Sequence, residues 1–149
     1  MGFGPNNNVL AMSGQTSPYV EAYAWNGSTG FGTKYSNPAT ASAAATTLTW
    51  HPSGLSLAIA LTGTPYVNAY AWSDASGFGT KYSDPGTLPA GTGYGVDFSN
   101  NGNVIAVSHS TSPYVTAYAW SNATGFGTKY SDPSTLPTGT GNGVTFAPT

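Results

Sequence analysis

Hydrophobic and polar positions alternate along much of this chain with a period of two, which is the period of a β-strand. The alternation is clearest in YVTAYAWS (114–121), where tyrosine, threonine and tryptophan take every second position and valine and alanine lie between them. Three neighbouring segments, at 95–99, 103–109 and 126–131, are also short and rich in strand-forming residues. The turn-forming runs NNG, STSP and NATG separate the segments, so the pattern predicts an antiparallel meander of four strands.

The same four-strand pattern is written three times. The heptapeptide GFGTKYS stands unchanged at 30–36, 77–83 and 125–131, at intervals of 47 and then 48 residues. Internal repeats of this length are typical of arrays, solenoids and propellers, in which each repeat is one supersecondary unit. We therefore expect a single all-β segment over 1–149, built from repeats at about 3–49, 50–97 and 98–145.

The repeats resemble the blades of WD40-type propellers. In VDFSNNGNVIAVSHSTSPYVTAYAWS, and in the matching runs FSNNG, WHPSG and FAP, an inner strand ends much as it does in that family, and VIAV and LAIA match its second strand. The family's Trp-Asp pair is absent, because Asn26, Ser73 and Ser121 follow the tryptophans, and its Gly-His pair and buried aspartate are also missing. The AYAW…GFGTKYS units are similar to phage-borne propeller repeats. The resemblance implies three four-stranded antiparallel propeller blades per chain.

Three blades do not close a ring, because propellers have typically four to eight. Phe3 matches Phe98 at the end of an inner strand, so we expect the first blade to lack its inner strand. The segment 141–149 carries a complete inner strand, and we expect its residues 143–147 to complete a blade of a neighbouring copy. One free end face would be rich in aromatic residues and the other in alanine. We therefore expect a homodimer with six blades, and a homotrimer with nine as the second choice.

The residues expected at this interface between copies lie on the second strand of the first repeat and on the C-terminal strand: Val9, Leu10, Ala11, Val144, Thr145 and Phe146.

Charge is sparse, and this limits the partners. The chain has three lysines, no arginine and five acidic residues, so we expect no binding of nucleic acid, which needs clustered basic side chains. The outermost strand of each repeat contains one lysine: Lys34, Lys81 and Lys129. We expect these lysines to discourage the open sheet edge from pairing with another chain. The alternative is that the lysine binds a ligand in each of the three repeats. The sequence has no cysteine, no signal-peptide pattern and no membrane-spanning apolar run. A virion and the cytoplasm are both compatible locations.

Catalytic chemistry has little support in the sequence. His51 and His109 occupy different positions in their repeats, and we interpret both as turn or surface residues. Asp84 and Asp132 stand in SDP, which is a turn signal. No residue spacing suggests a nucleophilic triad, a pair of catalytic acids or a metal site. We therefore expect no enzyme activity and no cofactor.

Two functional hypotheses remain. The first is a structural or interaction scaffold, favoured by near-identical repeats without a site signature. The alternative is a multivalent carbohydrate-binding module, in which loops at one end of the ring would bind a glycan or a peptide. We expect the tryptophans to be core residues rather than platforms on which a sugar stacks. The candidate ligand-binding residues are those that vary between matched repeats at that end: Tyr94, Asn142, Thr46, His109, Gln15 and Thr62.

Overall fold

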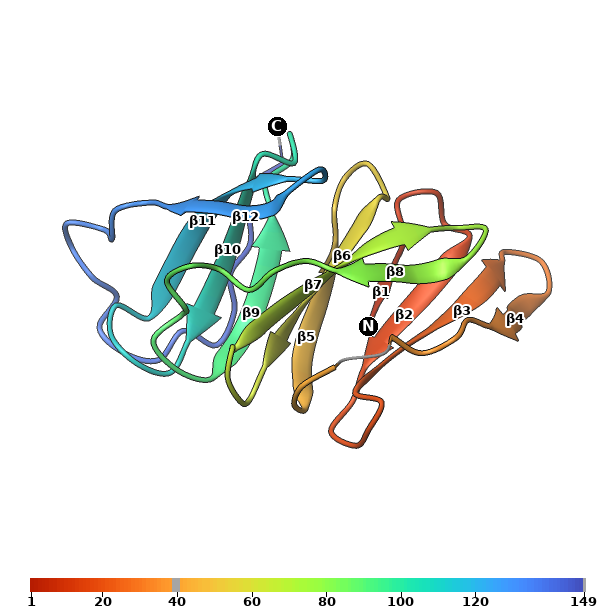
Figure 1. Ribbon diagram of the computed structural model, residues 1–149, viewed down its shortest axis with the longest axis horizontal. Coiled ribbons are helices and arrows are strands. Elements are labelled where there is room, and N and C mark those ends of the chain that lie inside the picture. The colour runs from red at the N-terminus through yellow and green to blue at the C-terminus, as the bar shows by residue number, and fades with distance from the viewer. Residues whose placement is uncertain (39–40, 149) are drawn as a thin grey trace.

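The computed structural model describes residues 1–38 and 41–148, and these form three four-stranded antiparallel sheets. The sheets lie side by side along the long axis of the molecule (Figure 1). We call them the first, second and third sheet. Their strands are, in chain order, β1 (Gly2–Phe3), β2 (Val9–Ser13), β3 (Val20–Asn26) and β4 (Gly30–Lys34); β5 (Ala45–Trp50), β6 (Ser56–Leu61), β7 (Val67–Ser73) and β8 (Gly77–Lys81); and β9 (Gly93–Phe98), β10 (Val104–His109), β11 (Val115–Ser121) and β12 (Gly125–Lys129).

The predicted meander is confirmed in each sheet, because strands that follow one another in the chain pair antiparallel. The predicted alternation is also confirmed on β11, where Thr116, Tyr118 and Trp120 are buried and the residues between them are half-buried. The outermost strands β4, β8 and β12 carry the GFGTK part of the heptapeptide. The described part of the chain contains no helix that could cross a lipid bilayer.

The turn between the second and third strand of each sheet has the same unusual backbone. A cis X-Pro bond precedes a tyrosine with a positive φ, of 67° at Tyr19, 71° at Tyr66 and 69° at Tyr114. Each of these tyrosines accepts a hydrogen bond through its carbonyl from the end of the preceding strand. The three repeats therefore share their turn geometry as well as their strands.

The two ends of the chain differ in their pairing. The first sheet does not lack an inner strand, because β1 pairs with β2 through Gly2–Ala11 and Phe3–Leu10; the strand is only two residues long. Residues 141–148 have no ladder partner within the chain, and the expected pairing of 143–147 with a neighbouring copy stays a prediction. A strand needs a neighbour to take its main-chain hydrogen bonds, and β9, which lies beside this segment, belongs to a different sheet.

Candidate interaction interface

Each sheet turns an aromatic face toward the preceding sheet and a face of small residues toward the following one. At the first junction, Tyr70 and Trp72 of the second sheet share a buried cluster with small and β-branched residues of the first sheet: Val9, Ala11, Val20 and Ala22. At the second junction, Tyr118 and Trp120 pack in the same way with Ala58, Ala60, Val67 and Ala69. The tryptophans at 72 and 120 are only 5% exposed, so they are core residues.

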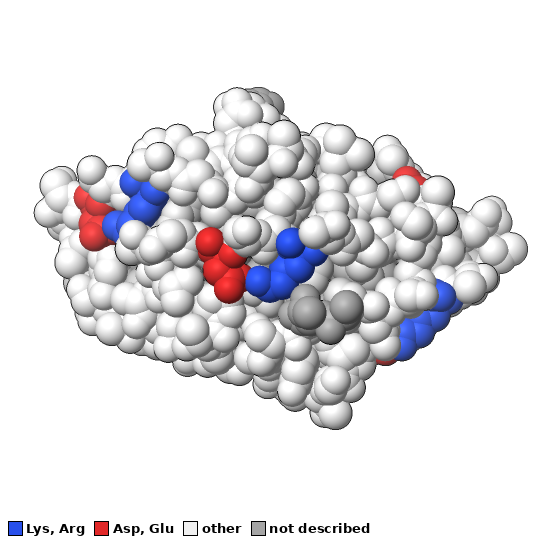
Figure 2. Space-filling view, viewed as in Figure 1, with Lys and Arg blue, Asp and Glu red and all other residues white. Residues whose placement is uncertain are grey.

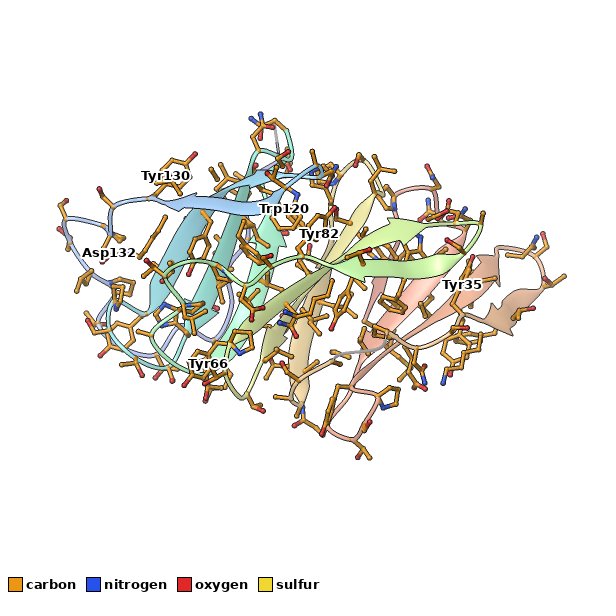
Figure 3. The ribbon with its side chains drawn as sticks, in the orientation of Figure 1. Tyr35, Tyr66, Tyr82, Trp120, Tyr130 and Asp132 are labelled. Carbon is orange, nitrogen blue, oxygen red and sulfur yellow. The ribbon has the colours of Figure 1, made fainter. Side chains whose placement is uncertain are left out.

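One tyrosine inserts into each junction from the sheet before it. The ring of Tyr35, just after β4, lies edge-on to Trp72 with the centroids 4.9 Å apart, and its hydroxyl donates to the carbonyl of Asp74 over 2.9 Å. Tyr82 repeats this arrangement with Trp120, at 5.0 Å. Figure 3 shows Tyr82 beside Trp120. Burial raises the pKa of Tyr35, which keeps its hydroxyl protonated and able to donate.

A glycine opposite each tyrosine provides the space for its ring. Gly77 has a φ of +81°, and a Cβ atom there would lie 2.9 Å from Cδ1 of Tyr35. Gly125 has a φ of +80°, and a Cβ atom there would lie 2.9 Å from Cβ of Tyr82. Both the backbone conformation and the tight contact exclude a side chain. We call the glycine, the tryptophan and the acceptor carbonyl together the tyrosine seat.

Polar side chains close the rim of each junction. Asp74 accepts hydrogen bonds from Asn8 of the first sheet, at 2.7 Å, and from Nε1 of Trp72, at 2.9 Å; these bonds lower its pKa. Asn122 occupies the equivalent position in the third sheet. Its amide oxygen accepts from Ser56 at 2.6 Å, and its amide nitrogen donates to Ser53 at 3.0 Å. Hydrogen bonds of this kind align neighbouring sheets as well as join them.

The first sheet carries a third tyrosine seat, and no described residue fills it. Gly30 has a φ of +83°, as in the filled seats, yet a Cβ atom built there would meet no atom within 4 Å. Trp25 beside it is half-buried and touches Phe3 and Phe31, which are 47% and 65% exposed. Met12 on the same sheet is 42% exposed. This face is therefore an exposed aromatic surface with a preformed gap.

The third sheet carries a tyrosine that has no seat. Tyr130 follows β12 as Tyr35 follows β4, and it is 49% exposed. Figure 3 shows it at the outer end of the third sheet, far from both filled junctions. On the neighbouring strand β11, the small and β-branched residues Val115, Ala117 and Ala119 are half-buried. The two end faces of the molecule therefore differ in the same way as the two sides of an internal junction.

The C-terminal segment, residues 141–147, lies against β9 at this end face. The side chain of Thr145 and the backbone N–H of Phe146 both donate to Oδ2 of Asp97, at 3.0 and 2.9 Å, while Thr49 of β5 donates to Oδ1 at 3.1 Å. Thr49, Asp97 and Thr145 are equivalent positions spaced by 48 residues, so the segment continues the series of inner strands β5 and β9. A small hollow beside it is lined by Ser99, Asn100, Asn101, Phe146 and Ala147.

No model of a known protein family and no curated protein matches the sequence. Among solved structures, the chain is similar to a protein from Lactobacillus plantarum, with a TM-score of 0.64 and 18% identity over 93% of this chain. It is also similar to Chaetomium thermophilum Sqt1 bound to the N-terminus of the ribosomal protein L10, with a TM-score of 0.60 and 17% identity over 82% of this chain. Together with the three four-stranded sheets, these neighbours establish the fold. The three sheets have the fold of WD40-like propeller blades. The chain spans 42% and 33% of the two neighbours, and each of its sheets is one blade.

The candidate ligand-binding residues lie where the loops that precede the inner strands meet the turns that follow the second strands. Hydrogen bonds join these two sets of loops, from Gln15 to the carbonyl of Ala45 and from Thr92 to the carbonyl of Thr62. Thr46 donates to backbone carbonyls of both β6 and β9, so its hydroxyl is used within the fold. Tyr94 is half-buried and Asn142 is exposed.

The expectation that both histidines are turn or surface residues is wrong for His109, which is the last residue of β10. It is partly right for His51, which opens the turn after β5 but is buried. His109 is fully buried, and its Nε2 pairs with the hydroxyl of Thr116 at 2.9 Å, so it has no surface to offer to a ligand. His51 is 7% exposed and lies between the second and third blades, where Nε2 pairs with the carbonyl of Gly102 at 3.0 Å. Burial lowers the pKa of both imidazoles.

The interface residues expected from the sequence stay a prediction, and their side chains differ in burial. Val9 and Ala11 are buried against the second blade, and Leu10 is 8% exposed, so these side chains are not on a free surface. Val144 and Phe146 are half-buried in the C-terminal segment, and Thr145 is exposed. The residues that form the open seat and its complement were not among those expected from the sequence: Trp25, Gly30, Phe31 and Tyr130. The signal was present, because GFGTKYS contains both the seat glycine of one blade and the tyrosine for the next.

The lysines lie at the ends of the outer strands, each paired with an acidic residue. Lys34 pairs with Glu21, Lys81 with Asp84 and Lys129 with Asp132. Figure 2 shows the blue lysine atoms as separate patches next to red carboxylates, with a further red patch apart from them. Among residues 1–38 and 41–148, no group of three histidine or acidic side chains is placed to hold a metal ion.

Proposed function

We propose that this chain is a non-catalytic interaction scaffold that completes its propeller by binding copies of itself head to tail. The observation that carries the proposal is the match between the two end faces. The first blade exposes an aromatic face that includes Phe31 and Met12, and the third blade exposes a face of small residues. The same two kinds of face meet at both internal junctions. Covering the exposed aromatic face would gain roughly 25 cal/mol per Å² of apolar surface buried.

The contact between these faces is heterologous, so it must either close into a ring or grow into an open assembly. Two copies would supply six blades and three copies nine, and only six lies within the usual range of propellers. We therefore favour a homodimer. The position of the C-terminal segment supports this arrangement, because it lies where the inner strand of a fourth blade would begin.

A scaffold role is better supported than the alternatives. The lysines pair with three of the five acidic residues, and Asp74 and Asp97 are held by hydrogen bonds within the fold, so the charged groups serve the structure. Carbohydrate binding is not proposed, because Thr46 and Gln15 donate to backbone carbonyls and His109 is buried.

Light scattering coupled to size-exclusion chromatography tests the proposal. We expect a mass of twice the 15.1 kDa of the chain, constant over a wide range of protein concentration. A dilution series would give the association constant needed for the variants described below. A chain that remains at 15.1 kDa even at high concentration would contradict the proposal.

A further inference from the structure

The inference concerns the residue that makes the contact between copies, and it rests on the proposed self-association. We propose that Tyr130 of one copy fills the open tyrosine seat of the next copy, formed by Gly30, Trp25 and the carbonyl of Gly27. The ring would lie edge-on to Trp25, and the hydroxyl would donate to that carbonyl.

The two internal junctions are the templates for this contact. In both, a tyrosine from the end of GFGTKYS meets the glycine at the start of the next GFGTKYS. Tyr35 and Tyr82 donate to the carbonyls of Asp74 and Asn122, and the repeat places Gly27 at the equivalent position. The heptapeptides of the first and third blades are identical to each other. A second copy therefore presents the tyrosine of the same heptapeptide. Tyrosines at this position already fill the two seats within the chain.

The open seat has the geometry of a filled one. The φ of Gly30 lies within a few degrees of those of Gly77 and Gly125. Phe31 stacks edge-on to Trp25 with the centroids 5.1 Å apart, as Phe78 does to Trp72 at 5.0 Å. Only the inserted tyrosine is missing, so the seat is preorganised and its occupant would not need to reshape it.

The hollow at the C-terminal segment supports the same docking. Its lining residues Ser99 and Asn101 are the repeat equivalents of His51 and Ser53, which contact Asn122 at the second junction. Gly27 is the repeat equivalent of Asn122, so the turn that contains it would lie over the hollow when Tyr130 enters the seat. One placement of a second copy would therefore fill both sites.

Cysteine cross-linking tests the contact without background, because the chain contains no cysteine. At the internal junction a Cβ atom at position 77 would lie 3.0 Å from Cβ of Tyr35, close to the separation of about 3.5–4.5 Å in disulfides. The chain with Tyr130→Cys is mixed with the chain carrying Gly30→Cys, and the mixture is oxidised. We expect a covalent dimer that is absent when either variant is oxidised alone. The matched control, Tyr35→Cys with Gly77→Cys in one chain, should cross-link without a change of mass.

Substitution of Tyr130 gives an independent test that does not depend on the glycine variant folding. We expect Tyr130→Ala to weaken association at least tenfold and Tyr130→Phe to weaken it less, since only the hydroxyl is lost. Both variants should keep the circular dichroism spectrum of the original chain. If the original chain is an oligomer but neither the cross-link nor the loss of affinity is seen, the Tyr130 contact is wrong and the proposed scaffold stands. If the original chain is a monomer, the proposed function itself fails.

Discussion

The ring of Tyr35 occupies the space that a side chain at position 77 would need. A Cβ atom on Gly77 would come within 2.9–3.2 Å of three atoms of Tyr35, whereas one on Gly30 would meet nothing within 4 Å. The two glycines have nearly the same φ, of +81° and +83°. The two glycines therefore separate two reasons why this position of a blade requires glycine: the left-handed backbone conformation and the neighbouring tyrosine ring.

This pair predicts different costs for the same substitution. Gly30→Ala should lower the free energy of unfolding by about 1 kcal/mol, the cost of a left-handed conformation for an alanine. Gly77→Ala should cost about 1–3 kcal/mol more, because it also forces Tyr35 out of its seat. Both variants are made in a Tyr130→Ala background, so that association does not enter, and are compared by urea denaturation. Equal costs would show that Tyr35 yields freely.

Much of the fold could be predicted from the sequence because each structural unit is local. The period of two in 114–121 identifies β11, and the spacing of GFGTKYS gives the three sheets and their order. The expected contrast between an aromatic and an alanine-rich face is confirmed by the packing of Trp72 and Trp120. These features depend on residues close together in the chain, which a repeat displays directly.

Features that depend on the three-dimensional surroundings of single residues could not be read in this way. His109 is buried because it stands at the position that Leu61 occupies in the preceding blade. A polar residue at this position does not by itself indicate burial. The short strand β1 is fixed by its two pairs with β2, and nothing in MGF alone indicates a strand. The open seat at Gly30 became visible only by comparison with the filled seats at Gly77 and Gly125.

Phe3 and Phe146 occupy the same position of the repeat, and in the proposed ring only one of them can pack on Trp25. Once paired, the C-terminal segment would give β2 a longer partner than the two residues of β1. Phe146→Ala should therefore weaken association about tenfold or more, since a buried aromatic ring contributes a few kcal/mol. Phe3→Ala is the matched variant and should leave association unchanged or strengthen it. A dilution series by light scattering measures both, and a larger loss with Phe3→Ala would reverse the assignment.

The lysines at the outer strands should matter more for solubility than for stability. Each ion pair is exposed enough that its loss, for example in Lys81→Thr, should change the free energy of unfolding by less than about 1 kcal/mol. Removing the charge from the open edge of β8 should nevertheless favour edge-to-edge pairing of molecules. Turbidity of a concentrated solution during prolonged incubation measures this. Asp84→Asn is the control, because it breaks the same pair but leaves the lysine; it should not aggregate faster.

The buried histidines predict that mild acid destabilises the fold. Burial lowers the pKa of His51 and of His109, whereas both would return to about 6.5 in the unfolded chain. Below that pH the unfolded chain binds more protons than the folded one, so the free energy of unfolding should fall as the pH drops. The full stability is present above about pH 6.5, and the loss should be evident by pH 5 in urea denaturation.

A double variant assigns the share of one histidine. His109→Leu restores the residue found at the equivalent position 61, and Thr116→Val removes the hydroxyl that would otherwise lose its buried partner. We expect this variant to be at least as stable as the original chain at pH 7.5, since Nδ1 of His109 is buried without a hydrogen-bond partner. Between pH 7.5 and pH 5 it should lose less stability than the original chain, because only His51 still resists protonation. An unchanged pH dependence would mean that His109 accepts a proton in the folded state as easily as in the unfolded one.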